Sequence, residues 1–133
     1  MALQLSTAVR NASLDAVETT IGASPTLEIR SGAPPANCAA AASGTVLVTI
    51  PLPADWANPA SGGQKTLLGT WQDASADASG TAGHYRVNQG ATCHIQGTIT
   101  ATGGGGDMTL DNVSIAATQQ VTITAFTLNA GGA

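Results

Sequence analysis

The chain has 133 residues and a formal net charge of −4, with only four lysines and arginines in all. This length is most simply one domain, residues 1–133, and so few basic residues exclude a surface that neutralises a nucleic-acid backbone. Leu, Ile, Val and Phe make up only 25 of the 133 residues. We therefore expect a thin core that gains from burying surface against neighbouring proteins.

The N-terminal stretch MALQLSTAVRNASLDAVE has neither the basic nor the apolar region of a secretory signal. No apolar run approaches the ~18 residues of a membrane span, so we expect no membrane partner. We expect synthesis in a cytosol, where a reducing environment disfavours disulfides. Cys38 and Cys93 are thus predicted to be free thiols, with a bridge between them as the less favoured alternative.

Residues 6–21 are predicted to form the N-terminal helix. Ser6 can cap its start and Gly22 can end it. Two adjacent apolar rows recur at helical spacing, one of Val9, Ala12 and Ala16 and one of Leu14, Val17 and Ile21. This broad stripe predicts packing on a sheet of the same chain, or docking onto another subunit.

After Pro25 the apolar period changes from 3.6 to 2, which predicts strands. Residues 27–30 read as a half-buried strand. Residues 45–52 read as a strand that is buried on both faces or lies at the centre of a sheet. The stretch between them, Ser31 to Gly44, is a Pro-, Ala- and Gly-rich linker with little capacity to pack. A loop over residues 54–63 and a further strand over residues 66–72 follow.

Residues 73–83 are predicted to form a second low-complexity loop. Residues 84–88 and 92–102 then form two strands, and the short Gly-containing spacer between them predicts a hairpin. In the second strand, apolar and polar residues alternate without a break. This phase places one set on one face, Cys93, Ile95, Gly97, Ile99 and Ala101, and the other set opposite, with His94 and Gln96.

The four glycines of ITATGGGGDMTLDN, residues 99–112, do not form a phosphate-binding loop, because Asp107 stands where such a loop requires lysine. The alternation after them predicts a flexible turn between two strands. In the last strand, residues 120–128, the phase breaks near Ala125, through a bulge or because the final apolar residues cover a neighbour. The sum is an all-β chain: a β-sandwich over residues 26–128, with jelly-roll or immunoglobulin-like connectivity.

No chemical site emerges from the residues. Cys38, Cys93, His84 and His94 do not make a zinc site, because adjacent strand residues point to opposite faces. DASADASG, residues 73–80, lacks the spacing of an EF-hand loop. Both histidines take solvent-facing strand positions, and the aspartates at 73, 77, 107 and 111 read as solubilising charge. We therefore expect no catalytic residue, no metal and no cofactor.

The chain has four aromatic residues, Trp56, Trp71, Tyr85 and Phe126. Trp71 and Tyr85 are predicted to be core residues. Trp56 lies in a Pro-flanked loop, where it either tucks under its own loop or serves as an exposed anchor at an interface.

Three stretches resemble a family of small virion proteins of tailed bacteriophages and prophages, over nearly the whole chain: STAVRNASLDAVETTIGASPTLEIRSGAPPANCAAAASGTVL, GTWQDASADASGTAGHYRV and QGTITATGGGGDMTLDNVSIAATQQVTITAFTL. The resemblance implies a non-enzymatic structural role, most plausibly that of a capsid decoration or cement protein, with a jelly-roll β-sandwich.

The resemblance also implies partners and a location. The partners are the major capsid protein and further copies of the chain, in a homodimer or homotrimer, and the location is the outer capsid surface of the virion after synthesis in the host cytoplasm. One rival is a tail, neck or fibre component. The other is a receptor- or carbohydrate-binding module that uses the loops around Trp56 and Asp73.

Overall fold

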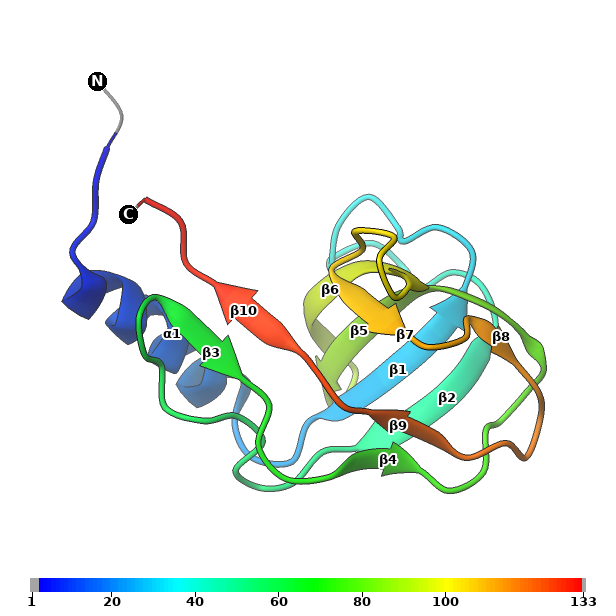
Figure 1. The fold of residues 1–133 in the computed structure, drawn as a ribbon. Coiled ribbons are helices and arrows are strands. Elements are labelled where there is room, and N and C mark those ends of the chain that lie inside the picture. Colours follow the sequence, from blue (N-terminus) through cyan, green and yellow to red (C-terminus); the bar gives the residue numbers. More distant parts are fainter. Residues whose placement is uncertain (1–2, 133) are drawn as a thin grey trace.

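The computed structural model describes residues 3–132, which form mostly strands and one N-terminal helix (Figure 1). The helix is α1 (Thr7–Ile21). Ten strands follow within the described range: β1 (Thr26–Ser31), β2 (Val46–Pro51), β3 (Gln64–Thr66), β4 (Trp71–Asp73), β5 (Gly80–Gln89), β6 (Thr92–Ala101), β7 (Met108–Leu110), β8 (Ser114–Ile115), β9 (Val121–Ile123) and β10 (Thr127–Asn129). The predicted all-β class with one N-terminal helix is confirmed.

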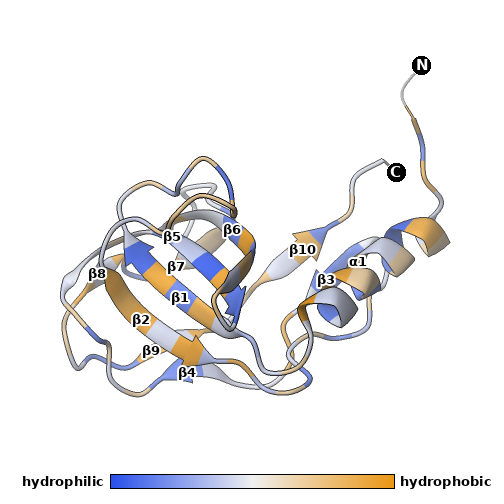
Figure 2. Cartoon of the chain, turned by 180° about the vertical axis from the view of Figure 1, so that it is seen from behind, coloured by the Kyte–Doolittle hydropathy of each residue, from blue (hydrophilic) through white to orange (hydrophobic). Residues whose placement is uncertain are grey.

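The largest sheet has the order β2-β1-β5-β6-β7, with β8 paired to β5, and it curls around the core (Figure 1). Its pairs are antiparallel except β6 with β7, which run parallel. Hydrophobic and hydrophilic residues alternate along β1, whereas β2 is largely hydrophobic (Figure 2). In β2 the consecutive residues Leu47 and Val48 are both buried, which confirms a strand buried on both faces. The alternative of a central strand is wrong, because β2 lies at the edge of the sheet.

Two predicted strands are each divided in the structure. The stretch over residues 66–72 is split between β3, which pairs with β10, and β4, which pairs with β9. Gly69 lies between them with φ +79°, a conformation that favours glycine and ends the extended chain. The predicted last strand is divided in the same way at the phase break near Ala125. Its first part, β9, pairs with β4 and ends at Ile123, and its second part, β10, pairs with β3 from Thr127.

We call α1, β3 and β10, together with residues 3–6 and 130–132, the arm, and we call the other described residues the body. In Figure 1 the arm lies to one side of the curled sheet. The predicted caps of α1 are confirmed: Ser6 Oγ accepts from Val9 N, and Gly22 ends the helix with φ +89°. Leu14 and Ile21 are buried, so the second apolar row of α1 packs against the rest of the protein. The first row, Val9, Ala12 and Ala16, is exposed.

Lys65 on β3 anchors α1 to β3 within the arm. Its side chain is buried, and Nζ lies 2.8 Å from both Asp15 Oδ1 and Glu18 Oε2 on α1. Burial opposes the charge of Lys65, but the hydrogen bonds with Asp15 and Glu18 outweigh it and raise its pKa. The hydrogen bond from Lys65, followed by that from Ala60 N, lowers the pKa of Asp15. The Asp15 contribution to stability is thus lost on acidification below pH 3.8, and that of Lys65 above pH 10.5.

An aromatic cluster joins the arm to the body. Trp71 lies 6.3 Å from Trp56 and 5.4 Å from Phe126, and Phe126 lies 5.7 Å from Tyr85, between ring centroids. All four side chains are buried, so the core positions predicted for Trp71 and Tyr85 are confirmed. Trp56 is also buried and donates through Nε1 to the carbonyl of Gly22 at the end of α1. It is tucked inside and is not an exposed anchor.

The predicted hairpin of β5 and β6 is confirmed, with Gly90 and Ala91 in its turn. The unbroken alternation along β6 is wrong. Val87 pairs with Ile95 and Asn88 pairs with Cys93, so His94 is an extra residue that bulges out of the ladder. The bulge moves Cys93 onto the face that also carries Arg86 and Gln96, because directly opposite residues share a face.

Candidate functional site

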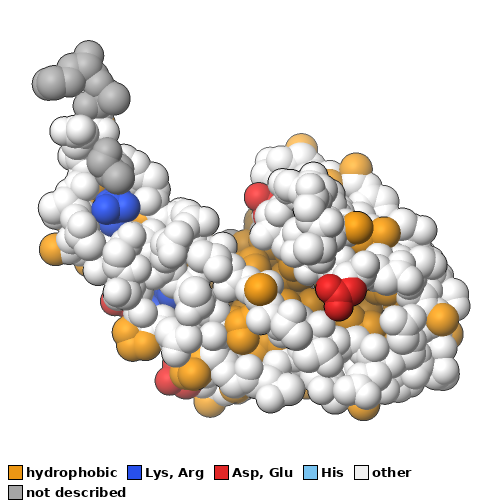
Figure 3. All heavy atoms as spheres, viewed as in Figure 1, with side chains coloured by type: hydrophobic (Ala, Val, Ile, Leu, Met, Phe, Trp, Pro, Cys, Tyr) orange, Lys and Arg blue, Asp and Glu red, His pale blue; other side chains and the backbone are white. Residues whose placement is uncertain are grey.

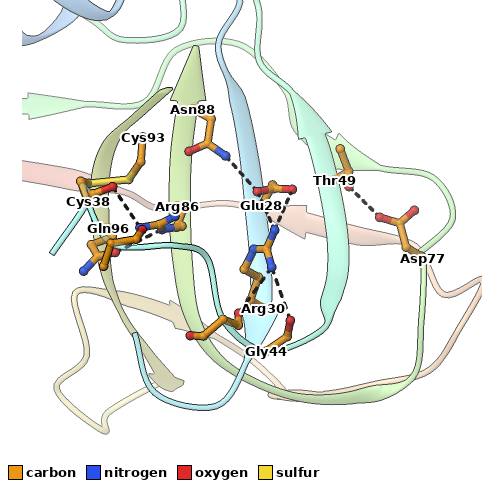
Figure 4. A network of polar contacts seen from close by, with 12 residues as sticks. Glu28, Arg30, Cys38, Gly44, Thr49, Asp77, Arg86, Asn88, Cys93 and Gln96 are labelled. Carbon is orange, nitrogen blue, oxygen red and sulfur yellow. Dashed lines mark hydrogen bonds and ion pairs between the residues drawn. A yellow bond between two sulfur atoms is a disulfide. The ribbon is translucent and has the colours of Figure 1, made fainter. Parts of the chain in front are cut away.

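The loop of residues 31–44 covers the outer face of β1, β5 and β6 (Figure 4). Polar contacts hold it at several points. Gln96 Nε2 donates to Pro35 O at 2.7 Å, Arg30 Nη1 to the carbonyls of Ser43 and Gly44 at 3.4 Å, and His84 Nδ1 lies 2.9 Å from Gly32 O. The prediction that this linker cannot pack is wrong, because hydrogen bonds to its backbone replace the apolar contacts that its sequence lacks.

Cys38 of this loop forms a disulfide with Cys93 of β6. The prediction of two free thiols is therefore wrong. The Cα atoms lie 5.3 Å apart, which is within the usual range for a bridge. The physical reason is local: the bulge at His94 turns Cys93 to the outer face, and Arg86 holds the carbonyl of Cys38 directly above it.

Arg86 is the central side chain beneath the loop and is only 5% exposed. Its Nη2 donates to the carbonyls of Asn37, Cys38 and Ala40 at 3.3, 3.2 and 2.9 Å, and its Nε donates to Gln96 Oε1 at 3.1 Å. A buried guanidinium therefore holds three backbone carbonyls of residues 37–40 against the sheet (Figure 4).

Beside Arg86 lies a polar cleft of about 440 Å³ between the sheet and the loop. Its floor carries Glu28, Arg30 and Asn88. The Glu28 carboxylate pairs with Arg30 at 3.3 Å and accepts from Asn88 Nδ2 at 2.9 Å. The opposite wall is formed by small residues, Ala39, Ala40, Ala41 and Ala42. The cleft offers hydrogen-bond donors and positive charge, and none of these side chains is a nucleophile.

Sequence reasoning missed this cleft, although a signal was present. Only four basic residues occur in the chain, and two of them, Arg30 and Arg86, lie on neighbouring strands with Glu28 directly opposite Arg86. Glu28, Arg30 and Arg86 share one face of neighbouring strands, and the linker of residues 31–44 follows directly after the first of these strands. This arrangement indicates a linker that folds over the charged side chains.

The two histidines have different environments. His94 is exposed, as predicted. His84 is fully buried, so the prediction that it faces solvent is wrong; it lies opposite Arg30 and Thr98, where the loop at Gly32 covers it. Among residues 3–132, no three His, Cys, Asp or Glu side chains gather as they would around a metal ion.

The acidic residues of the loops have structural contacts. Asp73 accepts from Thr49 N and Ser75 N, and Asp107 accepts from both the N–H and the hydroxyl of Thr98. The glycine quartet before Asp107 is a turn between two strands, as predicted, and it folds back so that Gly106 N donates to Thr100 Oγ1 at 3.0 Å. A simple reading of these carboxylates as solubilising charge is therefore incomplete.

A second cavity of about 440 Å³ lies between the arm and the body, lined by Tyr85, Gly106, Asp107 and residues 127–129 of β10. Figure 3 shows a notch between the arm and the body on this face. Burial, and then the nearby Asp107 carboxylate, raises the pKa of Tyr85 to about 12.

The tyrosine gives a direct test of this environment, because the chain contains only one. We expect the phenolate absorbance of the native protein to rise near pH 12, and that of the denatured protein near the ordinary value of about 10. Since the folded pKa is the higher one, stability falls as the pH rises from 10 towards 12. A native titration at the ordinary value would contradict the burial of Tyr85. Asp107→Asn should lower the native pKa only partly, because burial is the larger cause.

Comparisons of the chain with protein-family models, curated proteins and solved structures find no match. Among the described residues, no helix is long and apolar enough to cross a membrane.

Proposed function

We propose that the chain is a structural protein of a tailed-bacteriophage virion, a decoration protein that binds the outer surface of the major capsid protein shell and stabilises it. The observation that carries the proposal is the uncovered apolar face of α1. On this account the protein performs no catalysis, and the arm is the part that contacts the shell.

The uncovered face of α1 consists of Val9, Ala12 and Ala16. Val9 is 48% exposed, and Leu3, just before the helix, is 81% exposed. Beside this face runs a groove of about 300 Å³ lined by Ser13, Ala16, Val17, Thr20, Ile21 and His94. Leu3 and Val9 are the large hydrophobic residues that are exposed among residues 3–132, and both belong to the N-terminal part of the chain. An exposed apolar patch is typical of an interaction surface.

Both chain ends lie at the arm (Figure 1). Leu5 N donates to Gly132 O, which holds the N-terminal and C-terminal segments side by side next to α1. One partner surface could therefore contact the helix and both ends together. A protein that fastens to a lattice benefits from such a concentrated contact, because the opposite side of the molecule stays free.

The disulfide and the charge also support an outward position. Disulfides persist in oxidising surroundings, including virion surfaces, and Cys38 and Cys93 are bridged. The net charge of −4 suits the outside of a shell, since an inner protein would face packaged DNA phosphates.

The finer fold assignment and the assembly belong to the same proposal. We infer a jelly-roll-type sandwich, in which the curled sheet faces the pair β4 and β9 across a core that contains Trp71, Val121 and Ile123. We further infer a homodimer or homotrimer. Several weak contacts per oligomer, repeated over the shell, then give firm attachment through effective concentration.

Charge on the arm face should abolish binding to the shell. We expect the double variant Ala12→Glu and Ala16→Glu to stop co-sedimenting with particles stripped of the protein, because each carboxylate would be desolvated in the contact. Both sites are exposed in the free protein, and glutamate is a good helix former, so the variant should fold normally.

The matched control is the double variant Ala116→Glu and Ala117→Glu, at two exposed sites in the body loop between β8 and β9. We expect it to co-sediment like the wild type. Equal binding by the arm variant would show that the helix face is not the contact. Binding of the wild type to tails or necks instead of shells would contradict the capsid location.

A further inference from the structure

The charge of Arg86 has no carboxylate partner in the described chain. The ion pairs of residues 3–132 involve Arg30 and Lys65 with Asp15, Glu18 and Glu28, and none of them includes Arg86. Glu28, directly across the strand from Arg86, turns to Arg30 and Asn88 instead. A buried charge that is held only by neutral carbonyls and an amide is incompletely compensated.

Arg86 also has donors to spare. Its hydrogen bonds to the described residues use Nε and Nη2, which leaves both N–H groups of Nη1 without a partner there. Two more atoms on the cleft floor are buried without a partner among residues 3–132: the donor Arg30 Nε and the acceptor Asn88 Oδ1. Arg30, Arg86 and Asn88 all line the same cleft of about 440 Å³.

The charges of the cleft favour an anion. Arg30 and Glu28 neutralise each other, so Arg86 leaves a net charge of +1 in a chain whose total is −4. A carboxylate could accept from the Arg86 and Arg30 guanidinium groups in the fork geometry that suits both. The unpartnered Asn88 Oδ1 calls for an N–H or O–H group on the same ligand.

We propose that this cleft binds a carboxylate that carries a hydrogen-bond donor beside it, the chemistry shared by small N-acyl amino acids or hydroxy acids and by the C-terminus of a peptide. The alanine wall limits the ligand to a slim group. The site is independent of the arm face, so it does not rest on the proposed shell binding.

The test is an NMR titration of the oxidised full-length protein with N-acetylglycine, which has both the carboxylate and the N–H. We expect the side-chain resonances of Arg86 Nε–H and Asn88 Nδ2 to shift saturably, and N-acetylglycinamide, which lacks the charge, to cause no shift. An acetylated Ala-Ala-Gly peptide with a free C-terminus separates the two sources: tighter binding than N-acetylglycine assigns a chain terminus, and equal or weaker binding assigns a small acid.

Two substitutions in the covering loop test the cleft and leave Arg86 and its hydrogen bonds to the loop in place. Ala41 lines the cleft and is exposed, so Ala41→Glu places a competing carboxylate there and should weaken binding by about tenfold or more. Ala36 is exposed in the same loop outside the cleft, and Ala36→Glu should change the affinity by no more than about twofold. An absence of saturable shifts in the wild type, equal response to the amide, or equal binding by both variants would overturn the proposal.

Discussion

Replacing both cysteines, Cys38→Ser with Cys93→Ser, is expected to lower the free energy of unfolding by roughly 4 kcal/mol. The bridge joins residues separated by 55 positions, and a cross-link at that separation restricts the unfolded chain strongly. The covering loop over Arg86 should also lose order, since its remaining anchors are hydrogen bonds. Chemical denaturation of the oxidised wild type and the double variant measures the difference.

Reduction of the wild type with a thiol reagent is the matched control and should give the same loss. The reduced wild type differs from the variant only in having sulfur at two positions where the variant has oxygen, so the two denaturation curves should nearly coincide. If the oxidised wild type and the double variant unfolded at the same denaturant concentration, the disulfide would contribute nothing. The account of a loop fastened by Cys38 would then be wrong.

Trp71→Ala should be similarly damaging, with an expected loss in the free energy of unfolding of about 3–5 kcal/mol. Trp71 is fully buried and contacts both Trp56 and Phe126, so its removal leaves a cavity at the joint between arm and body. For a domain of ordinary stability this loss approaches the whole folding free energy. Thermal unfolding followed by circular dichroism provides the measurement.

Trp71→Phe is the informative control, because it keeps an aromatic ring and much of the buried area. We expect it to lose clearly less stability than Trp71→Ala. The fluorescence of the remaining Trp56 reports separately on the joint, since its indole donates to the carbonyl of Gly22, directly after α1. If Trp71→Ala unfolded at the wild-type temperature, the joint would not depend on this side chain.

The helix was predictable because its signals are local. Ser6 and Gly22 are capping residues by chemistry alone, and the structure uses both. Which apolar row would be buried was not predictable, because it depends on a partner distant in sequence. Lys65, 50 residues after Asp15, decides it by pairing with Asp15 and Glu18.

Strand positions were predictable, but strand register was not. The alternation along β6 extends without a break in the sequence, yet the structure inserts His94 as a bulge. A bulge depends on the facing strand, and one extra residue turns all residues beyond it to the other face. That single shift accounts for the wrong face of Cys93. The disulfide was missed for a different reason, because we expected a reducing cytosol to keep both thiols free.

The polar cleft was hidden for a related reason. Periodicity treats a charged strand residue as solvent-facing, and it places Arg86 and His84 outside. A loop without apolar residues gives no sign that it will cover them. Its backbone carbonyls satisfy Arg86, a contact to which any residue type can contribute. Packing of this kind therefore cannot be predicted from which residues the loop contains.

The most direct test of the proposed shell binding is electron cryo-microscopy of the bacteriophage particles in which we propose that the chain resides. The account predicts regular density over the capsid lattice that fits the curled sheet, with α1 and both chain ends against the shell and the body facing outward. Density confined to the neck or tail, or lattice density in which α1 faces solvent, would contradict it.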